Sequence, residues 1–292
     1  MVVSPELATL VALLRYGSYR REQMSLRQRL IEGESPAEIL ADEPNPQELL
    51  QKAHDDIDQW ITAGEQPISW CDEEYPQQLR EVHDFPPVIF TRGTRVPYDH
   101  GLCVVGSRNA GPRAINAARD LARIIVDKGW TVVSGLAKGV DTAAHREALE
   151  CGGRTVAVIG NGIDLYYPAQ NRALQETIEN RGLVVSQFWP GSSPTRYSFP
   201  MRNAVMSAYG SATIIVEASE SSGTRHQARQ AAAHSRPLVV SRSVYEGTTW
   251  ARKLVDSPHV LAAVATSAVE AVDKAIGMVE FTFSPPALAA LL

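Results

Sequence analysis

The amino-acid sequence predicts an α/β fold in which a mostly parallel sheet carries helices on both faces and follows a small helical domain at residues 1–64. Beyond Gly101, short runs rich in Val and Ile alternate with helical stretches at the intervals of βαβ units. Near the N-terminus, apolar residues recur at helical spacing instead, as in Leu7, Leu10 and Leu14. This change in the spacing of apolar residues separates the helical N-terminal part from the α/β part of the chain.

Two further helices of the N-terminal domain, which we expect to be of the SAM or helix-hairpin kind, should begin at prolines. Pro36 follows Ser35, and Pro46 follows Asn45, so each proline would occupy the first helical turn behind a capping side chain. Residues 65–100 hold several prolines and short apolar runs. They predict two short strands or extended pieces with a turn between them, which form an extended connector that joins the helical domain to the core.

The core is predicted to span residues 101–280 and to hold a Rossmann-like sheet, because its apolar runs are typical of buried parallel strands. The strands are expected at 103–105, 131–133, 155–159, 183–185, 212–216 and 237–240. The helices are expected at 114–128, 138–150, 170–181, 201–210, 224–235, 248–255 and 267–276. Residues 281–292 are expected to form a C-terminal tail.

Cysteine usage and the N-terminal segment indicate the compartment. The cysteines Cys71, Cys103 and Cys151 are odd in number, far apart and without metal-ligand spacing, which argues for a reducing environment and against a disulfide framework or a zinc site. The first residues lack a basic segment followed by an apolar core, and no apolar run approaches the roughly 18 residues of a membrane span. We therefore expect a soluble, cytoplasmic protein that does not contact membranes.

The charge of the chain is unevenly distributed. The net charge is −5, which by itself argues against a nucleic-acid partner. Residues 1–100, however, hold nine Lys and Arg against eighteen Asp and Glu, a net of −9, whereas residues 101–292 hold nineteen against fifteen, a net of +4. A polyanion would therefore bind the second part of the chain.

Candidate binding residues follow the expected strands, because ligands of open parallel sheets bind beyond the carboxyl ends of the strands. The turns there combine glycines, hydroxyls and cations, with aromatic residues interleaved. The candidates are Gly106, Ser107, Arg108, Ser134, Gly135, Lys138, Phe199, Arg202, Asn203, Gly223, Thr224 and Arg225. Such an edge suits phosphates that lie next to stackable rings.

The sequence lacks the signatures of several enzyme classes. It has no GxxxxGK[ST] phosphate loop and no GxSxG nucleophile elbow, and Gly160 and Gly162 are followed by Leu165 where a dinucleotide motif needs its third glycine. Asp141 and His145 share a helix face at i and i+4. For Asp141 we prefer a favourable interaction with the helix N-terminus, and for His145 packing or hydrogen bonding. We predict no catalytic residue, no metal and no cofactor.

Five motifs in one register, together with an upstream segment, resemble the DNA-processing protein A family, also called DprA or Smf. The motifs are residues 105–108, 134–141, 160–164, 199–203 and 216–218, preceded by segments at 75–79 and 86–90. The resemblance covers about residues 65–240. It implies a Rossmann-like core and a non-enzymatic, homodimeric protein that binds and protects single-stranded DNA and helps load the RecA recombinase, notably in natural transformation.

The resemblance also assigns roles to residues of this chain. Arg108, Lys138 and Arg202 match the cations of the family's DNA pocket. The turns that shape the pocket match Gly106, Ser107, Ser134, Gly135, Asn203 and Gly223. Cations would hold phosphates without reading sequence, and the ring of Phe199 would stack on bases, so binding should tolerate any sequence and weaken with salt.

The chain departs from the family pattern at several points, which indicate a divergent member. Residues 224–227 replace small and apolar residues, the segment after Val240 lacks Val-Pro-Gly, and no winged-helix domain is expected at the C-terminus. A nucleotide-binding sensor or ribohydrolase of the same superfamily is the alternative, although Gln227 stands where such a hydrolase has its glutamate. A third possibility is a protein-interaction module that uses the acidic N-terminal helices.

Overall fold

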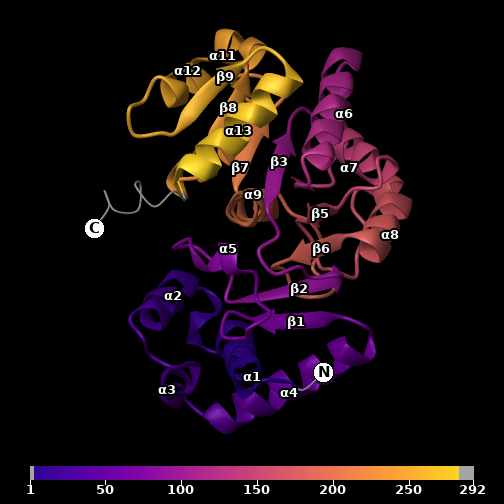
Figure 1. Cartoon of the computed structure of the whole chain (residues 1–292). Helices are drawn as coiled ribbons and strands as arrows, with labels where there is room; N and C mark the ends of the chain where they lie inside the picture. Colours follow the sequence, from indigo (N-terminus) through magenta and orange to yellow (C-terminus); the bar gives the residue numbers. More distant parts are fainter. Residues whose placement is uncertain (1–2, 283–292) are drawn as a thin grey trace.

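The computed structural model describes residues 3–282, and within them the strands form one nine-stranded, mostly parallel sheet (Figure 1). The strands are β1 (Gln66–Ser69), β2 (Val88–Gly93), β3 (Gly101–Val105), β4 (Thr131–Ser134), β5 (Thr155–Val158), β6 (Leu183–Ser186), β7 (Ala212–Ile215), β8 (Leu238–Ser241) and β9 (Ala262–Ala265). Their order in the sheet is β1-β2-β6-β5-β4-β3-β7-β8-β9. The predicted fold class is confirmed, and the sheet is Rossmann-like.

The N-terminal part is helical, as predicted. Its helices are α1 (Pro5–Val11), η1 (Ala12–Tyr16), η2 (Ser18–Arg20), α2 (Gln23–Ile31), α3 (Pro36–Ala41) and α4 (Pro46–Thr62). Ser35 caps α3 as expected, because its hydroxyl accepts from the backbone N–H of Glu38 while the Glu38 carboxylate accepts from the backbone N–H of Ser35. Asn45 precedes α4 with a left-handed φ of 58°, and its side chain makes no capping hydrogen bond. The capping prediction is therefore right for Ser35 and wrong for Asn45.

Residues 65–100, where we expected a connector of two short strands or extended pieces, contain the strands β1 and β2 and the short helix α5 (Gln77–Arg80), and both strands belong to the sheet. Strand β2 pairs antiparallel with β6 and with β1. The apolar side chains of Val88, Ile89 and Phe90 are buried between the N-terminal helices and the core, which draws the segment into the sheet. Pro67 is tolerated in β1 because β1 is an edge strand with one row of backbone groups unpaired.

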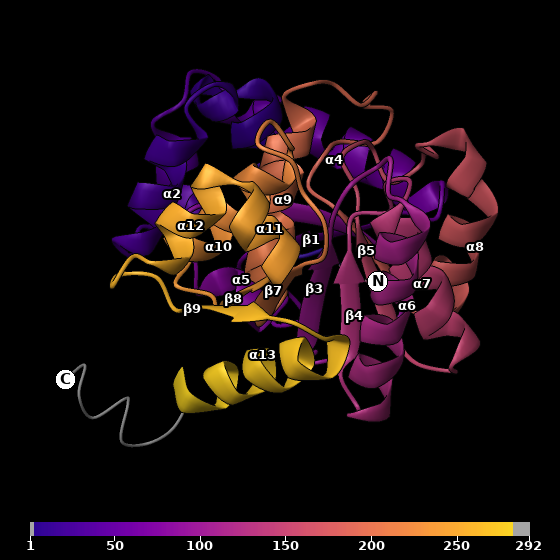
Figure 2. The ribbon, with the colours of Figure 1, turned by 90° about the horizontal axis from the view of Figure 1, so that it is seen from above.

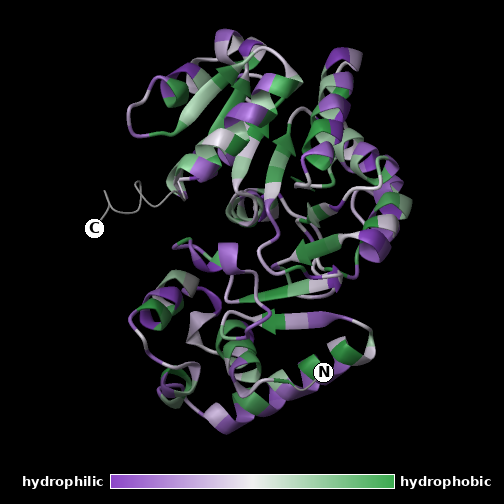
Figure 3. Ribbon diagram, viewed as in Figure 1, coloured by the Kyte–Doolittle hydropathy of each residue, from purple (hydrophilic) through white to green (hydrophobic). Residues whose placement is uncertain are grey.

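Helices cover both faces of the sheet. One face is covered by α6 (Pro112–Asp127), α7 (Val140–Glu150) and α13 (Ala268–Thr282). The other face is covered by α9 (Ser198–Tyr209), α10 (Thr224–Ala233) and α12 (Thr249–Val255). Helix α8 (Arg172–Arg181) packs beside β5 and β6. Strand β3 shows the division, because Leu102 and Val104 pack in the hydrophobic cluster under α6 and α7, whereas Cys103 and Val105 pack in the cluster under α9. Figure 3 shows the strands mostly hydrophobic and the outer helix faces largely hydrophilic.

The end of the chain contains two elements that the sequence did not predict, α11 (Arg242–Gly247) and β9. Strand β9 consists mainly of alanine, which has little intrinsic preference for strands, and its conformation comes from its pairing with β8. Residues 281 and 282 of the expected tail are the last turn of α13, and residues 283–292 lie outside the described residues. None of the described helices has the length and apolar character that crossing a membrane requires.

The sheet has a topological switch point between β3 and β7. From β3 the chain adds β4, β5 and β6 towards one side of the sheet, and it then returns to place β7 on the other side of β3. The loops after β3 and β7 therefore lead to opposite faces, which opens a crevice at the carboxyl ends of these strands. This crevice is where a ligand is expected.

Candidate nucleic-acid interface

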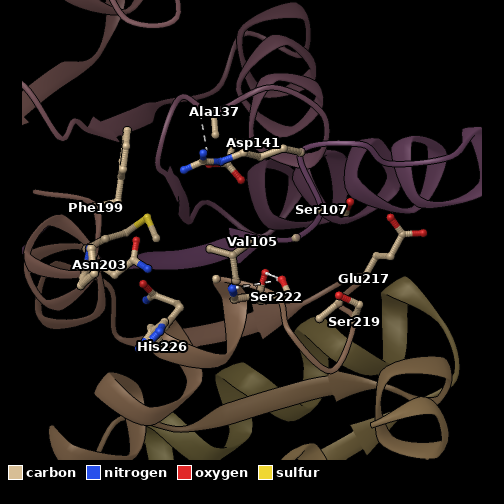
Figure 4. A pocket seen from close by; sticks show the side chains of 18 of the residues that line it. Val105, Ser107, Ala137, Asp141, Phe199, Asn203, Glu217, Ser219, Ser222 and His226 are labelled. Carbon is tan, nitrogen blue, oxygen red and sulfur yellow. Dashed lines mark hydrogen bonds between the residues drawn. The ribbon is translucent and has the colours of Figure 1, made fainter. Parts of the chain in front are cut away.

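Two adjoining cavities occupy the carboxyl edge of the sheet. The first, which we call the switch-point cavity, has a volume of about 620 Å³ and lies between the β3–α6 turn, α9 and the β7–α10 turn (Figure 4). The second, the cationic cavity, has a volume of about 270 Å³ and lies between the β3–α6 and β4–α7 turns and residues 160–168. Both cavities are lined by Arg108, Asn109, Ala137, Phe199 and Arg202, so we refer to the two together as the groove.

Most of the predicted residues meet at this groove. Those that line the switch-point cavity are Gly106, Ser107, Arg108, Phe199, Arg202, Asn203, Gly223 and Thr224. Gly135 and Lys138 line the cationic cavity. Figure 4 shows Phe199 and Asn203 on the side of the switch-point cavity opposite Ser107 and Glu217. Residues from several loops and helices, far apart in the sequence, are therefore brought together.

Two predicted residues lie elsewhere. Ser134 is fully buried, and its hydroxyl donates to the carbonyl of Val104 at 2.7 Å, so it ties β4 to β3 beneath the groove. Arg225 lines neither cavity, and its Nε is buried without a hydrogen-bond partner among the described residues. Arg225 lies in the first turn of α10 between Thr224 and His226, which both line the switch-point cavity, and its own half-buried side chain does not. The prediction of Ser134 and Arg225 as groove residues is corrected.

The cationic cavity combines positive charge with aromatic rings. Arg108 and Lys138 are exposed, neither forms an ion pair within residues 3–282, and no Asp or Glu lines this cavity. The Arg108 guanidinium carbon lies 4.7 Å from the centroid of the Phe199 ring, and the Phe199 and Tyr167 ring centroids are 5.9 Å apart. Unpaired cations beside rings are suited to hold phosphates and to stack on bases.

Tyr167 is the aromatic residue that the sequence-based selection omitted. Its side chain is 44% exposed, and it lines the cationic cavity together with Phe199. Its position after the third strand of the core, next to Pro168, was a usable signal. A tyrosine in that place is nevertheless more often a packing residue, so the sequence alone did not select it.

Arg202 differs from the other two predicted cations because its side chain is buried. The residue is 5% exposed, its Nη1 lies 3.4 Å from the carbonyl of Val158, and its Nε has no hydrogen-bond partner among the described residues. Burial lowers the pKa of Arg202, an effect that the nearby Asp141 carboxylate opposes. Arginine nevertheless keeps its proton in proteins, so the largely buried Arg202 contributes positive charge to the wall of the groove.

Two of the predicted glycines are required by the chain itself. A Cβ at Gly135 would lie 1.2 Å from Nη1 of Arg202, and a Cβ at Gly106 would lie 2.6 Å from Cγ2 of Val140. At Gly223, in contrast, an added methyl group would have no atom within 4 Å, and this glycine faces the open switch-point cavity. Gly223 therefore leaves space on the side of the cavity, whereas Gly106 and Gly135 leave space for side chains of the protein itself.

Asp141 and His145 do not form an acid–base pair. Asp141 Oδ2 accepts a hydrogen bond from the backbone N–H of Ala137 at 3.2 Å, which Figure 4 draws as a dashed line. Burial raises the pKa of Asp141, and the positive charge of Arg202 opposes this shift. His145 is fully buried, its Nδ1 is hydrogen-bonded to the hydroxyl of Thr155 at 2.7 Å, and burial lowers its pKa to about 3. The predicted hydrogen-bonding role of His145 is confirmed.

The switch-point cavity is more neutral than the cationic cavity. Its wall includes the hydroxyls of Ser219, Ser222 and Thr224 together with the carboxylate of Glu217. Gln227 also belongs to this wall; it is 1% exposed, and neither polar atom of its amide has a partner among the described residues. A buried amide without partners costs roughly 1–3 kcal/mol, which is a reason to look for a ligand nearby.

A sequence model described as DNA recombination-mediator protein A matches residues 66–276, which is more than half of the chain. The chain belongs to this family. The resemblance to DprA and Smf proteins is thereby confirmed, and the family match begins at β1, in keeping with the place of β1 and β2 in the sheet.

Individual relatives agree with the family assignment. The chain is 35% identical over 202 residues to protein Smf of Synechocystis, and this match covers 66% of the chain and 48% of the relative. It is 36% identical over 187 residues to the DNA processing protein DprA of Streptococcus pneumoniae, and this match covers 62% of the chain and 64% of the relative. The chain thus spans about half to two thirds of the length of these two relatives.

Solved structures of family members share the fold. The crystal structure of DprA from Streptococcus pneumoniae superposes with a TM-score of 0.66 at 28% identity, covering 91% of this chain and 92% of the other. DNA processing protein A from Helicobacter pylori, whose structure addresses its mode of binding single-stranded DNA, superposes with a TM-score of 0.62 at 23% identity, covering 73% of this chain and 96% of the other. At that identity the likeness to the Helicobacter protein concerns the fold.

Proposed function

We propose that this protein binds single-stranded DNA along the groove without regard to base sequence. The observation that carries this proposal is the cationic cavity, where the unpaired side chains of Arg108 and Lys138 stand beside the rings of Phe199 and Tyr167. Phosphates would bind the cations, and bases would stack on the rings, because every base has an aromatic face.

The shape and charge of the groove favour an unpaired strand over a duplex. Bases stacked inside a duplex are not available to rings in a cavity of about 270 Å³, whereas the bases of a single strand can turn towards Phe199 and Tyr167. The residues that we propose to contact DNA are Gly106, Ser107, Arg108, Lys138, Tyr167, Phe199, Asn203, Gly223 and Thr224, with Gly135 and Arg202 supporting the wall.

We further infer that the protein is a non-enzymatic mediator of recombination that protects single-stranded DNA and promotes RecA loading, as a homodimer in the cytoplasm. The family's description as a recombination mediator and the single-stranded DNA binding of the Helicobacter relative support this inference. The buried titratable residues beside the groove also favour a binding role, because Asp141 and His145 are engaged in hydrogen bonds within the fold.

A second candidate function is the binding of a free nucleotide in the switch-point cavity. The unpartnered amide of Gln227 and the carboxylate of Glu217 favour it, because an amide can pair with a base edge and a carboxylate at the end of a strand can accept from sugar hydroxyls. Thermal unfolding with nucleoside monophosphates tests this candidate, and an unchanged melting temperature would count against it. Ribohydrolase activity is not favoured, because Gln227 lacks the required carboxylate.

Fluorescence polarisation with oligo-dT and with a duplex of equal length tests the main proposal. We expect tighter binding to the single strand and a fall of log K with log salt of slope about −2, corresponding to about three phosphate contacts. Arg108→Glu should weaken binding about 100-fold, whereas Arg21→Glu, an exposed arginine of the N-terminal part, should change it less than two-fold. Equal affinity for duplex and single strand, or an unaffected Arg108→Glu variant, would contradict the proposal.

A further inference from the structure

A third cavity lies beside the groove on the α6–α7 face of the molecule. Its volume is about 280 Å³, and its charged lining residues are Arg119 of α6 and Arg146 of α7. Both arginines are exposed, and neither forms an ion pair or a hydrogen bond within residues 3–282. No Asp or Glu lines the cavity, so the charges that line it are both positive.

The neighbouring Arg123 shows that free arginines are not the rule on this face. Arg123 lies one helical turn beyond Arg119 on α6, and its guanidinium is paired with Glu147 of α7 and with Asp120. Arg119, one turn earlier on α6, has no such partner within residues 3–282, although the two helices carry carboxylates. The free cations are those nearer to the groove.

The third cavity adjoins the groove. Its wall includes Gly139, which directly follows Lys138 of the cationic cavity. Gly139 has a φ of 76°, and a Cβ there would lie 2.3 Å from the carbonyl oxygen of Ser107, so the β4–α7 turn is held tightly against the β3–α6 turn. One peptide unit therefore separates the lining of the two cavities.

The backbone adds to the positive potential of this region. Helices α6 and α7 pack side by side, as Figure 2 shows, and each begins beyond a strand that ends at the carboxyl edge of the sheet. The cavity lining includes Ile115 in the first turn of α6 and Gly139 at the N-terminal end of α7. The N-terminal end of a helix carries a partial positive charge, so the two helix ends and the two guanidiniums favour an anion in the same place.

We propose that the bound single strand leaves the groove past Lys138 and Gly139 and continues over the α6–α7 face, where Arg119 and Arg146 hold its phosphates. This inference rests on the proposed function and extends it with a second contact region. The occupant is the same DNA strand, because the cavity adjoins the groove and its charged lining residues are all positive. A phosphate backbone presents negative charges at regular intervals, so successive phosphates can bind successive cations.

The test compares oligonucleotides of two lengths. A dT oligomer of about six nucleotides should fill the groove, whereas one of about twenty nucleotides should also reach the α6–α7 face. For the variant Arg119→Gln/Arg146→Gln, we expect about five-fold weaker binding of the longer oligomer and less than a two-fold change for the shorter one. The salt slope for the longer oligomer should decrease in magnitude by about 1.4, which corresponds to two lost phosphate contacts.

Single variants on one helix provide the matched control. Arg119→Gln and Arg123→Gln remove the same charge from α6 one turn apart, and only Arg119→Gln should weaken binding of the longer oligomer, because Arg123 is already neutralised by Glu147. The inference would be overturned if Arg119→Gln and Arg123→Gln lost equal affinity. It would also be overturned if the double variant lost equal affinity for both oligomers, or lost none for either. Each of these results would leave the proposed function intact. Failure of the parent protein to bind either oligomer would overturn both.

Discussion

Two groups of arginines in this protein differ in their partners. The first group lies at the seam, by which we mean the contacts that residues 65–100 make with one another and with the rest of the sheet and its helices. There Arg236 pairs with Glu81 at 2.7 Å, and Arg154 pairs with Asp99 at 2.9 Å. These cations are mostly buried, and each is matched by a carboxylate.

The second group lies at the groove and beside it. Arg108, Arg119 and Arg146 are exposed, and none of them has a carboxylate partner within residues 3–282. A cation without a partner adds little to the stability of the fold, but its charge remains available to a polyanion. The comparison teaches that the seam arginines are held by carboxylates, whereas the charges of Arg108, Arg119 and Arg146 stay available to the DNA strand that we propose.

The largest effect on stability is expected at the seam. Glu65 is 3% exposed and holds the guanidinium of Arg92, which also approaches Glu179. Glu65→Gln should lower the free energy of unfolding by about 3 kcal/mol, because it leaves a largely buried cation without its main partner. Urea denaturation measures this loss, and the control Glu48→Gln, in an exposed pair with Lys52, should cost less than about 0.5 kcal/mol. A large loss of DNA affinity in the folded Glu65→Gln variant would contradict the distinction between the arginines of the seam and those of the groove.

Gly135→Ala tests the buried Arg202, which belongs to neither group. The added methyl would collide with the Arg202 guanidinium and displace it, at a cost of about 2 kcal/mol. Differential scanning calorimetry should show a lower melting temperature. Gly277→Ala, at a helical position with nothing within 4 Å, should instead raise stability by about 0.5–1 kcal/mol. If Gly135→Ala were as stable as the parent, the packing of Arg202 against Gly135 would have to be abandoned.

The pH dependence of stability tests the buried His145 beneath the groove. Its folded-state pKa of about 3 lies below the unfolded value of about 6.5, so between these values the unfolded chain binds a proton that the folded protein does not. Stability is therefore lost as the pH falls below about 6.5, by about 2 kcal/mol from this residue between pH 7 and pH 5. Urea denaturation of the parent and of His145→Gln at both pH values measures the difference. Equal pH dependence in the two proteins would show that His145 titrates normally.

The smallest effect is expected at Lys138. Lys138→Gln removes one exposed, unpaired cation and should weaken oligo-dT binding about three-fold, with the salt slope reduced in magnitude by about 0.7. The free energy of unfolding should stay within about 0.5 kcal/mol of the parent, since no ion pair is lost. Polarisation titrations and urea denaturation on the same preparation check both statements. If the free energy of unfolding changed by more than the free energy of DNA binding, Lys138 would be a structural cation like those of the seam.

Much of the fold follows from short-range patterns in the sequence. The strands of the core were predicted to within about a residue at most ends, because continuous apolar runs between turn signals depend only on neighbouring residues. Features that depend on a distant partner were not predicted. Strand β9 is held by β8, and the expected connector joins the sheet through the pairing of β2 with β6.

The sequence alone determined which turns meet at the carboxyl edge of the sheet, and with them the place of Arg108, Lys138 and Phe199. The tertiary structure decided which of the selected side chains reach the solvent. Arg202 is covered by packing against Gly135, and Ser134 turns inward to a carbonyl of the neighbouring strand. The physical reason is that the position of a turn follows from local periodicity, whereas exposure and pairing depend on atoms contributed by segments far away in the chain.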